Sequence, residues 1–267
     1  MSTQVNELFN NIWNNYLEVT PSAGKIHQLL RSGHDVINDH VAYRTFNLEK
    51  VGIEKLAQHL LALGYTECGE YHFEAKKLYA KHFEHQDTSL PKVFISELLV
   101  EEFSPQVQEI IHELVENIDE ALIAQPSFLY SGKTWQLSYE DYKTLLAESE
   151  YAAWLAAWGY RANHFTVSIN HLTNFENIED VNSTLKAAGF TLNATGGEIK
   201  GDSTVRLEQS STLADKVIVE FSDESVEIPS CFYEFAKRYP MIDGSLYTGF
   251  VAASADKIFE STNNVAA

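Results

Sequence analysis

The chain has 267 residues, of which 45% are hydrophobic and 21% charged, so its composition is that of a folded globule and not of a long disordered segment. Acidic residues outnumber basic ones by 38 to 19, and the resulting net charge of −19 repels nucleic-acid phosphates and anionic lipids. We therefore expect neither a nucleic acid nor a membrane as a partner.

Residues 1–19 have the spacing of an amphipathic helix, and they lack the basic leader and continuous apolar stretch of a signal peptide. No apolar run reaches the roughly 18 residues of a membrane-spanning helix. Cys68 and Cys231 occur without a CxxC pattern, which is typical of reduced thiols. These features predict a soluble, cytoplasmic protein.

A weak internal repeat follows along the chain. The first copy opens with a β-favouring run at 38–47, continues with a helical pattern at 52–65 that a glycine ends, and then gives several short β-like runs up to residue 100. Between the copies, 104–158 has helical patterns. The second copy opens with a β-like run at 162–170, has a helical pattern at 178–190, and ends in further β-like runs.

The two copies agree in register, because His40 precedes Gly64 by 24 positions and His164 precedes Gly189 by 25. We therefore predict an α+β fold in a single domain, 1–267. Two paired βαβββ modules, at about 38–100 and 162–261, would form a curved sheet or barrel, and a helical insert at 104–158 would add an accessory layer.

Two histidines at matching repeat positions suggest a metal site where the modules meet. A mononuclear non-haem iron site needs two neutral imidazoles and one carboxylate on one face. His40 and His164 would supply the imidazoles, although a single histidine near a strand start is more often a hydrogen-bonded structural residue. Glu97, Glu220 and Glu234 are the candidate carboxylates on late strands, and spacing alone leaves the choice among them open.

Arg44 follows His40 by four residues, so the two side chains share one face of a strand. Its guanidinium could bind a carboxylate of a ligand at the metal, or form an ordinary ion pair. Near the end of the chain, small residues precede a helical pattern in the run 244–261. Ser254 there could contact substrate, but its spacing favours a helix cap.

Several runs resemble the 2-oxoadipate dioxygenase/decarboxylase family, the D-2-hydroxyglutarate synthases of lysine catabolism, over about 38–261. They are NDHVAYRTFN, ESEYAAWLAAWGYRANHFTVSIN, RLEQSSTLAD, VEFSD, IPSCFYEFAKRYP and YTGFVAASADKIFEST. The resemblance implies a vicinal-oxygen-chelate fold. In that wider group the third ligand lies in a pattern F-x-E-x-x-x-R, here FYEFAKR, followed by GF and then I/L-F-E. This chain has the short form, with 16 positions from Glu234 to Phe250.

This resemblance implies that His40, His164 and Glu234 bind Fe(II). It further implies that Arg44 binds a substrate carboxylate and that Ala253 and Ser254 contact the distal end of the 2-oxoacid, with His40 and Arg44 both facing the substrate. The expected enzyme is an Fe(II)-dependent dioxygenase/decarboxylase that converts 2-oxoadipate and O₂ to 2-hydroxyglutarate and CO₂.

Three alternatives remain from the residues alone. The same ligands suit a hydrolase or isomerase that uses Zn²⁺ or Ni²⁺. The protein could instead bind a small ligand between the modules without turnover, or act as an interaction protein through its helical insert. The sequence does not indicate an oligomeric state.

Overall fold

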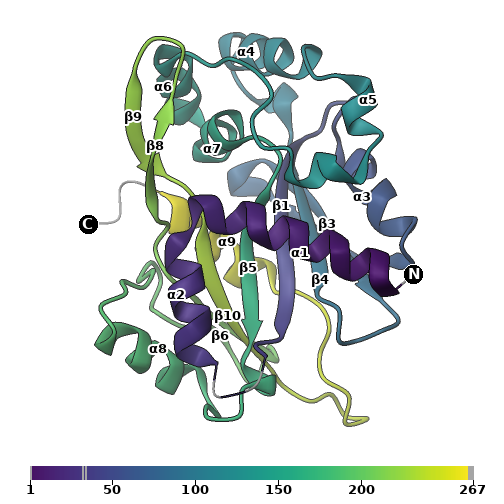
Figure 1. Cartoon of the computed structure of the whole chain (residues 1–267), viewed down its shortest axis with the longest axis vertical. Coiled ribbons are helices and arrows are strands. Elements are labelled where there is room, and N and C mark those ends of the chain that lie inside the picture. The colour runs from purple at the N-terminus through teal and green to yellow at the C-terminus, as the bar shows by residue number, and fades with distance from the viewer. Residues whose placement is uncertain (1, 32, 34, 264–267) are drawn as a thin grey trace.

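The computed structural model describes residues 2–31, 33 and 35–263. Its centre is a mixed eight-stranded sheet in the order β2-β3-β4-β1-β5-β10-β7-β6, which curls as a half-barrel (Figure 1). The strands are β1 (Asn38–Phe46), β2 (Tyr65–Phe73), β3 (Leu78–His85), β4 (Lys92–Leu98), β5 (Ala162–Ser168), β6 (Lys200–Asp202), β7 (Leu207–Ser211) and β10 (Phe232–Arg238).

The sheet shows the expected duplication. In the first half β1 pairs in parallel with β4, and in the second half β5 pairs in parallel with β10. The two halves join where β1 and β5 run antiparallel, with His40 opposite Thr166 and Ala42 opposite His164. This exchange of positions is that of a local two-fold axis between the two central strands. The prediction of an α+β fold from two paired modules is confirmed.

The second module departs from the expected strand pattern in two places. The run after Gly189 forms only an isolated bridge, between Leu192 and Thr212. The run KVIVE becomes β8 (Lys216–Glu220), which pairs with β9 (Ser225–Pro229) in a separate hairpin. Within β8 only Val219 is buried, and the hairpin lies outside the main sheet.

The helices lie on both faces of the sheet and in the insert, and the structure has no membrane-spanning candidate among the helices of the described residues. They are α1 (Ser2–Val19), α2 (Pro21–Leu30), α3 (Ile53–Leu61), α4 (Pro105–Glu116), α5 (Glu120–Ile123), α6 (Tyr139–Glu148), α7 (Glu150–Trp158), α8 (Ile178–Ala187) and α9 (Ala252–Ile258).

The opposite coverage of the two faces explains why β5 is buried at every position. Figure 1 shows α1 crossing in front of β5, with α9 behind the sheet. Trp13 of α1 packs edge-on to Phe165, at 4.9 Å between ring centroids, and also contacts Tyr233 of β10 at 5.8 Å. Since strand side chains alternate between faces, His164 and Thr166 point away from α1 and toward the concave side of the sheet.

Candidate metal centre

Strand register gathers the three expected ligands on the concave side. Thr166 pairs with His40 across one edge of β5 and with Glu234 across the other, so these three residues form one row over three strands. His164 lies two residues before Thr166 and therefore shares its face. Residues separated by up to 194 positions thus converge through strand pairing, with register shifts in the β1–β5 pair between Asn38 and His40 and between Ala42 and Tyr43.

The three side chains are buried and close together. His40 is 2% exposed, His164 4% and Glu234 0%. One ligand atom from each lies within 4.8 Å of those of the other two. Nε2 of His164 is 3.0 Å from Oε2 of Glu234, and Nε2 of His40 is 3.7 Å from Oε1. The predicted cluster therefore has the donor set and the compactness of a metal site.

The residue before each histidine fixes its tautomer. Oδ1 of Asp39 accepts from Nδ1 of His40 at 2.8 Å, and Oδ1 of Asn163 accepts from Nδ1 of His164 at 3.0 Å. With the proton on Nδ1, each Nε2 keeps a lone pair for a cation. Burial lowers the pKa of His164, which favours the neutral form that metals bind. The Thr166 hydroxyl contacts Nε2 of His40 at 3.0 Å and would turn aside for a cation.

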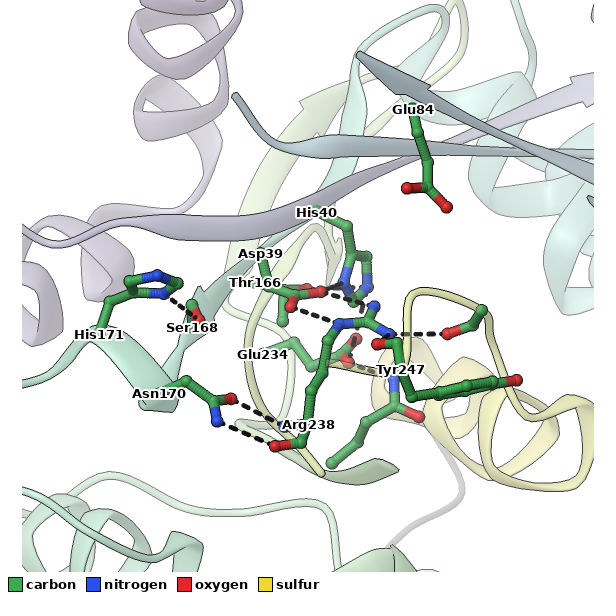
Figure 2. A network of polar contacts seen from close by, with 12 residues as sticks. Asp39, His40, Glu84, Thr166, Ser168, Asn170, His171, Glu234, Arg238 and Tyr247 are labelled. Atoms are coloured by element: carbon green, nitrogen blue, oxygen red, sulfur yellow. Dashed lines mark hydrogen bonds and ion pairs between the residues drawn. The ribbon is translucent and has the colours of Figure 1, made fainter. Parts of the chain in front are cut away.

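Asp39 belongs to a larger buried network, drawn in Figure 2. Nε and Nη2 of Arg238 donate to its two oxygens at 2.6 and 2.8 Å. Burial alone would raise the pKa of Asp39, but Arg238 and His40 hold it well below its usual range. Arg238 also donates to the carbonyls of Tyr247 and Gly249, at 3.0 and 2.7 Å. The support of His40 is therefore linked to the segment that carries Phe250.

The carboxylate of Glu234 has a buried oxygen that fits a cation. Nε2 of Gln209 donates to Oε1 at 2.6 Å, whereas Oε2 has no hydrogen-bond donor within the part of the chain that the structure describes. Burial would raise the pKa of Glu234, but His40, His164 and Gln209 lower it, so the carboxylate stays ionised. Its Oε2 lies 3.0 Å from Nε2 of His164, which keeps a lone pair when the imidazole proton is on Nδ1. Two ligands at about 2.1 Å from one cation and at right angles have this separation, so the residues fit a metal ion.

The cavity at the cluster is small. Its volume is about 20 Å³, which holds roughly one water molecule and not a six-carbon diacid. The ring of Phe250 lies 4.8 Å from that of His40 and 5.0 Å from that of Phe94. Substrate entry therefore requires the segment around Phe250, or α9, to move. The lining residues are His40, Ala42, Phe94, His164, Gln209, Glu234, Phe250, Ala255, Ile258 and Phe259.

Of the residues expected to bind substrate, His40 lines this cavity, whereas Arg44, Ala253 and Ser254 do not. The side chain of Arg44 is 1% exposed, and its Nη1 donates to both oxygens of Glu150 at 3.1 and 3.3 Å. At the start of α9, Ala253 is exposed, while Ser254 is buried with its Oγ beside Gly201. Ser254 does not cap α9, because the helix begins after Val251 without a side-chain cap.

The two other candidate carboxylates lie elsewhere. Oε2 of Glu97 accepts from the backbone nitrogen of Ile53 at 2.9 Å and so holds the start of α3. Glu220 is on the β8–β9 hairpin, where its Oε2 accepts from Ser225. The sequence analysis missed Asp39, Asn163, Gln209 and Arg238. A polar residue directly before each repeat histidine was a signal for the first two. The family pattern F-x-E-x-x-x-R contains Arg238 but does not show its contact with Asp39, and Gln209 could not be assigned a contact without the strand register.

Cys68, His82 and Glu84 form a second group of possible ligands. Here both histidine nitrogens already have partners, since Nε2 contacts Glu84 at 2.9 Å and Nδ1 contacts the Tyr71 hydroxyl at 2.9 Å. That hydroxyl accepts from the backbone nitrogen of Phe250 at 3.1 Å. This group therefore holds the segment over the metal cavity and leaves no free imidazole lone pair.

Comparison with known proteins gives a consistent result. The profile of the family described as 2-oxoadipate dioxygenase/decarboxylase matches residues 2–245. The chain is 37% identical, over 93% of its length and 76% of the relative, to the chloroplastic/amyloplastic 2-oxoadipate dioxygenase/decarboxylase of Oryza sativa.

Solved structures with a similar fold include members of the same family. The crystal structure of the Oryza sativa hydroxyglutarate synthase with 2-oxoadipate has a TM-score of 0.91 at 35% identity, covering 97% of this chain and 91% of that one. A Shewanella frigidimarina protein with a provisional hydrolase description has a TM-score of 0.91 at 63% identity, covering 93% and 98%. A Ralstonia eutropha protein provisionally placed in the glyoxalase superfamily shares the fold, with a TM-score of 0.78 at 22% identity over 92% and 85%. The expected α+β fold with a curved sheet is therefore shared with these solved structures.

Proposed function

The chain belongs to the 2-oxoadipate dioxygenase/decarboxylase family, and on this premise we propose that His40, His164 and Glu234 hold a ferrous ion. The enzyme converts 2-oxoadipate and O₂ to 2-hydroxyglutarate and CO₂. The observation that supports the site is the convergence of Nε2 of His40 and Nε2 of His164 on the buried carboxylate of Glu234, whose Oε2 has no hydrogen-bond donor among the described residues.

The donor set favours iron. Two imidazoles and one carboxylate on one face are typical of non-haem Fe(II) oxygenases, because the opposite positions stay open for substrate and O₂. When bound, ferrous iron would supply the activation of O₂ that oxidative decarboxylation of a 2-oxoacid needs.

The residues around the ligands orient them and keep the site dry. Asp39 and Asn163 hold the imidazoles with Nε2 toward Glu234, and Gln209 fixes the carboxylate plane. Phe94 and Phe250 exclude water from the reacting groups. Each of these roles keeps a ligand or the cavity in one arrangement before substrate arrives.

Substrate recognition would use Arg44, which shares a strand face with His40 and can offer a planar fork to a carboxylate. Nε of Arg44 is a buried donor without a partner in the described chain, which supports this role. We propose that Ala253 and Ser254, in the first turn of α9, contact the distal end of the diacid once α9 has moved. The cytoplasmic location expected from the sequence stays a prediction.

The test is to load the protein anaerobically with Fe(II), then to admit air with a series of 2-oxo diacids while O₂ uptake and CO₂ release are followed. We expect uptake and release in equal amounts, highest with 2-oxoadipate. Fe(II)-loaded protein that consumes no O₂ with any diacid would contradict the proposal.

A metal-dependent hydrolase is the second candidate, favoured by the provisional description of the Shewanella frigidimarina structure. His₂Glu also suits Zn²⁺, which activates a bound water. Metal analysis separates the two. Zinc in the purified protein, together with ester or amide hydrolysis and no O₂ uptake after iron loading, would favour the hydrolase.

A further inference from the structure

The charge of Arg44 is buried in a box built largely by the helical insert. Its Cζ lies 4.8 Å from the ring centroid of Tyr151 and 4.9 Å from that of Trp154, both on α7. A guanidinium stays charged in proteins, so its burial requires an anionic partner. Glu150, whose side chain is 22% exposed, is that partner and begins the same helix.

The hydrogen bonds of Arg44 leave the nitrogen Nε of its guanidinium without an acceptor among the described residues. Both oxygens of Glu150 meet the same nitrogen, Nη1. Nη2 donates to the neutral hydroxyl of Thr262 at 2.9 Å, and Nε is a buried donor with no acceptor in the described residues. Nε and Nη2 point along one edge of the planar fork, and such an edge binds a carboxylate through two parallel hydrogen bonds. This edge can therefore bind a second carboxylate without use of the nitrogen that holds Glu150.

The start of α7 is fixed in place. Oγ of Ser149 accepts from the backbone nitrogen of Ala152 at 3.1 Å and caps the helix. The hydroxyl of Tyr151 accepts from the backbone nitrogen of Thr45 on β1 at 3.0 Å and donates to the carbonyl of Ser96 on β4 at 2.6 Å. Glu150 lies between these two anchored residues, so its backbone cannot swing away when a ligand arrives.

We propose that Glu150 is a positioning residue for substrate recognition. By holding Nη1 it turns the Nε–Nη2 edge of Arg44 toward the carboxylate of the oxo diacid. The inference rests on the proposed function, in which Arg44 binds that carboxylate. It also gives the helical insert a role, because the insert supplies Glu150, Tyr151 and Trp154 to a strand of the first module.

The experiment compares Glu150→Gln with Glu148→Gln in Fe(II)-loaded protein. Glu148 is a matched control. It is exposed and lines the same surface pocket as Glu150, but its carboxylate accepts from Ser104 and does not contact Arg44. For Glu150→Gln we expect the KM for 2-oxoadipate and its anaerobic Kd, measured by calorimetry, to rise about tenfold. Its kcat should stay within about twofold and its iron content should not change. Glu148→Gln should keep the wild-type KM and Kd.

A double-mutant cycle links the effect to Arg44. In an Arg44→Met background, Glu150→Gln should weaken 2-oxoadipate binding no further. A lower Kd in Glu150→Gln would mean that Glu150 competes with substrate for Arg44, and it would overturn the proposal. An unchanged Kd with a lower melting temperature would overturn it as well, because Glu150 would then only stabilise the fold.

Glu150→Asp keeps the inference testable if the glutamine variant does not fold. It retains the charge but withdraws the carboxylate by one methylene, and we expect weaker binding of 2-oxoadipate at a wild-type melting temperature. Wild-type binding by Glu150→Asp would contradict the positioning role. A wild-type protein that fails to bind 2-oxoadipate would overturn the proposed function itself, and this is seen before any variant is compared.

Discussion

The two modules place equivalent residues around one centre, yet they contribute different chemistry. His40 lies opposite Lys92 and His164 opposite Phe232, so each histidine has the same place in its strand pair. Two residues further along, the first module pairs Ala42 with Phe94, whereas the second pairs Thr166 with Glu234. Both modules therefore give an imidazole, but only the second gives a carboxylate.

Because of this difference, one side of the cluster has no protein ligand among the described residues. A second glutamate in place of Phe94 would surround the cation with four protein ligands. The first module instead provides an apolar wall at Phe94, and its next inward residue is Arg44, where the second module has Ser168. One half of the duplicated sheet thus completes the proposed ligand set, and the other half supplies an apolar wall and Arg44, the proposed contact of the substrate.

The largest effect should follow from removal of the carboxylate that breaks the symmetry. Glu234→Ala should lose most of its bound iron and about 10³-fold in kcat/KM, because two imidazoles alone hold the cation weakly. Glu97→Ala and Glu220→Ala are matched controls that should keep both. Iron is measured by elemental analysis after desalting. Iron retained by Glu234→Ala but lost from Glu220→Ala would move the third ligand to the hairpin.

A carboxylate added to the first module, to match Glu234 in the second, should lower the activity nearly as much. Phe94→Glu places a carboxylate where the first module lacks one, and as a fourth ligand it should lower turnover by roughly 100-fold without loss of iron. A buried, unpaired carboxylate also costs stability, so Fe(II) should raise the melting temperature more in this variant than in the wild type.

Phe94→Leu, which keeps an apolar wall, is the control and should retain most of the activity. If Phe94→Glu were as active as Phe94→Leu, the open face of the centre would not lie on the side of Phe94.

Whether a residue of this site can be predicted from the sequence depends on how far apart along the chain its contacts lie. The repeat places His40 and His164 correctly, because a strand, helix and glycine in the same order carry the register locally. Glu234 could not be chosen by alternation, since β10 is buried on both faces and every inward or outward position has an apolar neighbour. The choice came from the resemblance to the family, and the pairing with Thr166 explains it.

The contacts that support the ligands and Arg44 could not be predicted from the sequence for the same reason. Arg238 meets Asp39 across 199 positions, and Arg44 meets Glu150 across 106. An i, i+4 spacing shows that Arg44 shares a strand face with His40, but it cannot show which helix closes over that face. The run that forms β8 was counted among the strands of the second module, because its β-favouring residues do not reveal that only one of them is buried and that it pairs outside the main sheet.

The two supports of the histidines should differ in strength. Asp39 carries a charge and is itself held by Arg238, whereas Asn163 is a neutral amide. Asp39→Asn should weaken iron binding by about 10–100-fold and, by leaving Arg238 buried without its anion, cost about 3–5 kcal/mol of folding free energy. Asn163→Ala should cost less in both. Chelator competition gives the affinities and urea unfolding the stability, and equal losses in the two variants would contradict this ranking.

The smallest effect concerns the outer edge strands, where β2 has no lysine or arginine and its counterpart β6 begins with Lys200. This lysine is 3% exposed, its Nζ donates to the carbonyl of Asn193 at 2.5 Å, and burial lowers its pKa to about 8. Because its ordinary pKa is 10.5, the unfolded chain binds more protons than the folded one between about pH 8 and 10.5. The lysine therefore lowers stability at neutral pH, and this penalty fades as the pH rises.

Lys200→Met should consequently gain stability relative to the wild type at pH 7, on the order of 1 kcal/mol. The gain should shrink steadily when urea unfolding of both proteins is repeated at pH 8, 9 and 10. A difference that stays constant with pH would mean that Lys200 is charged in the folded protein throughout this range. The attraction between Lys200 and Glu234 would then offset the burial of the charged ammonium group. Lys200 would in that case contribute to the electrostatics of the metal centre and would not destabilise the edge of the sheet.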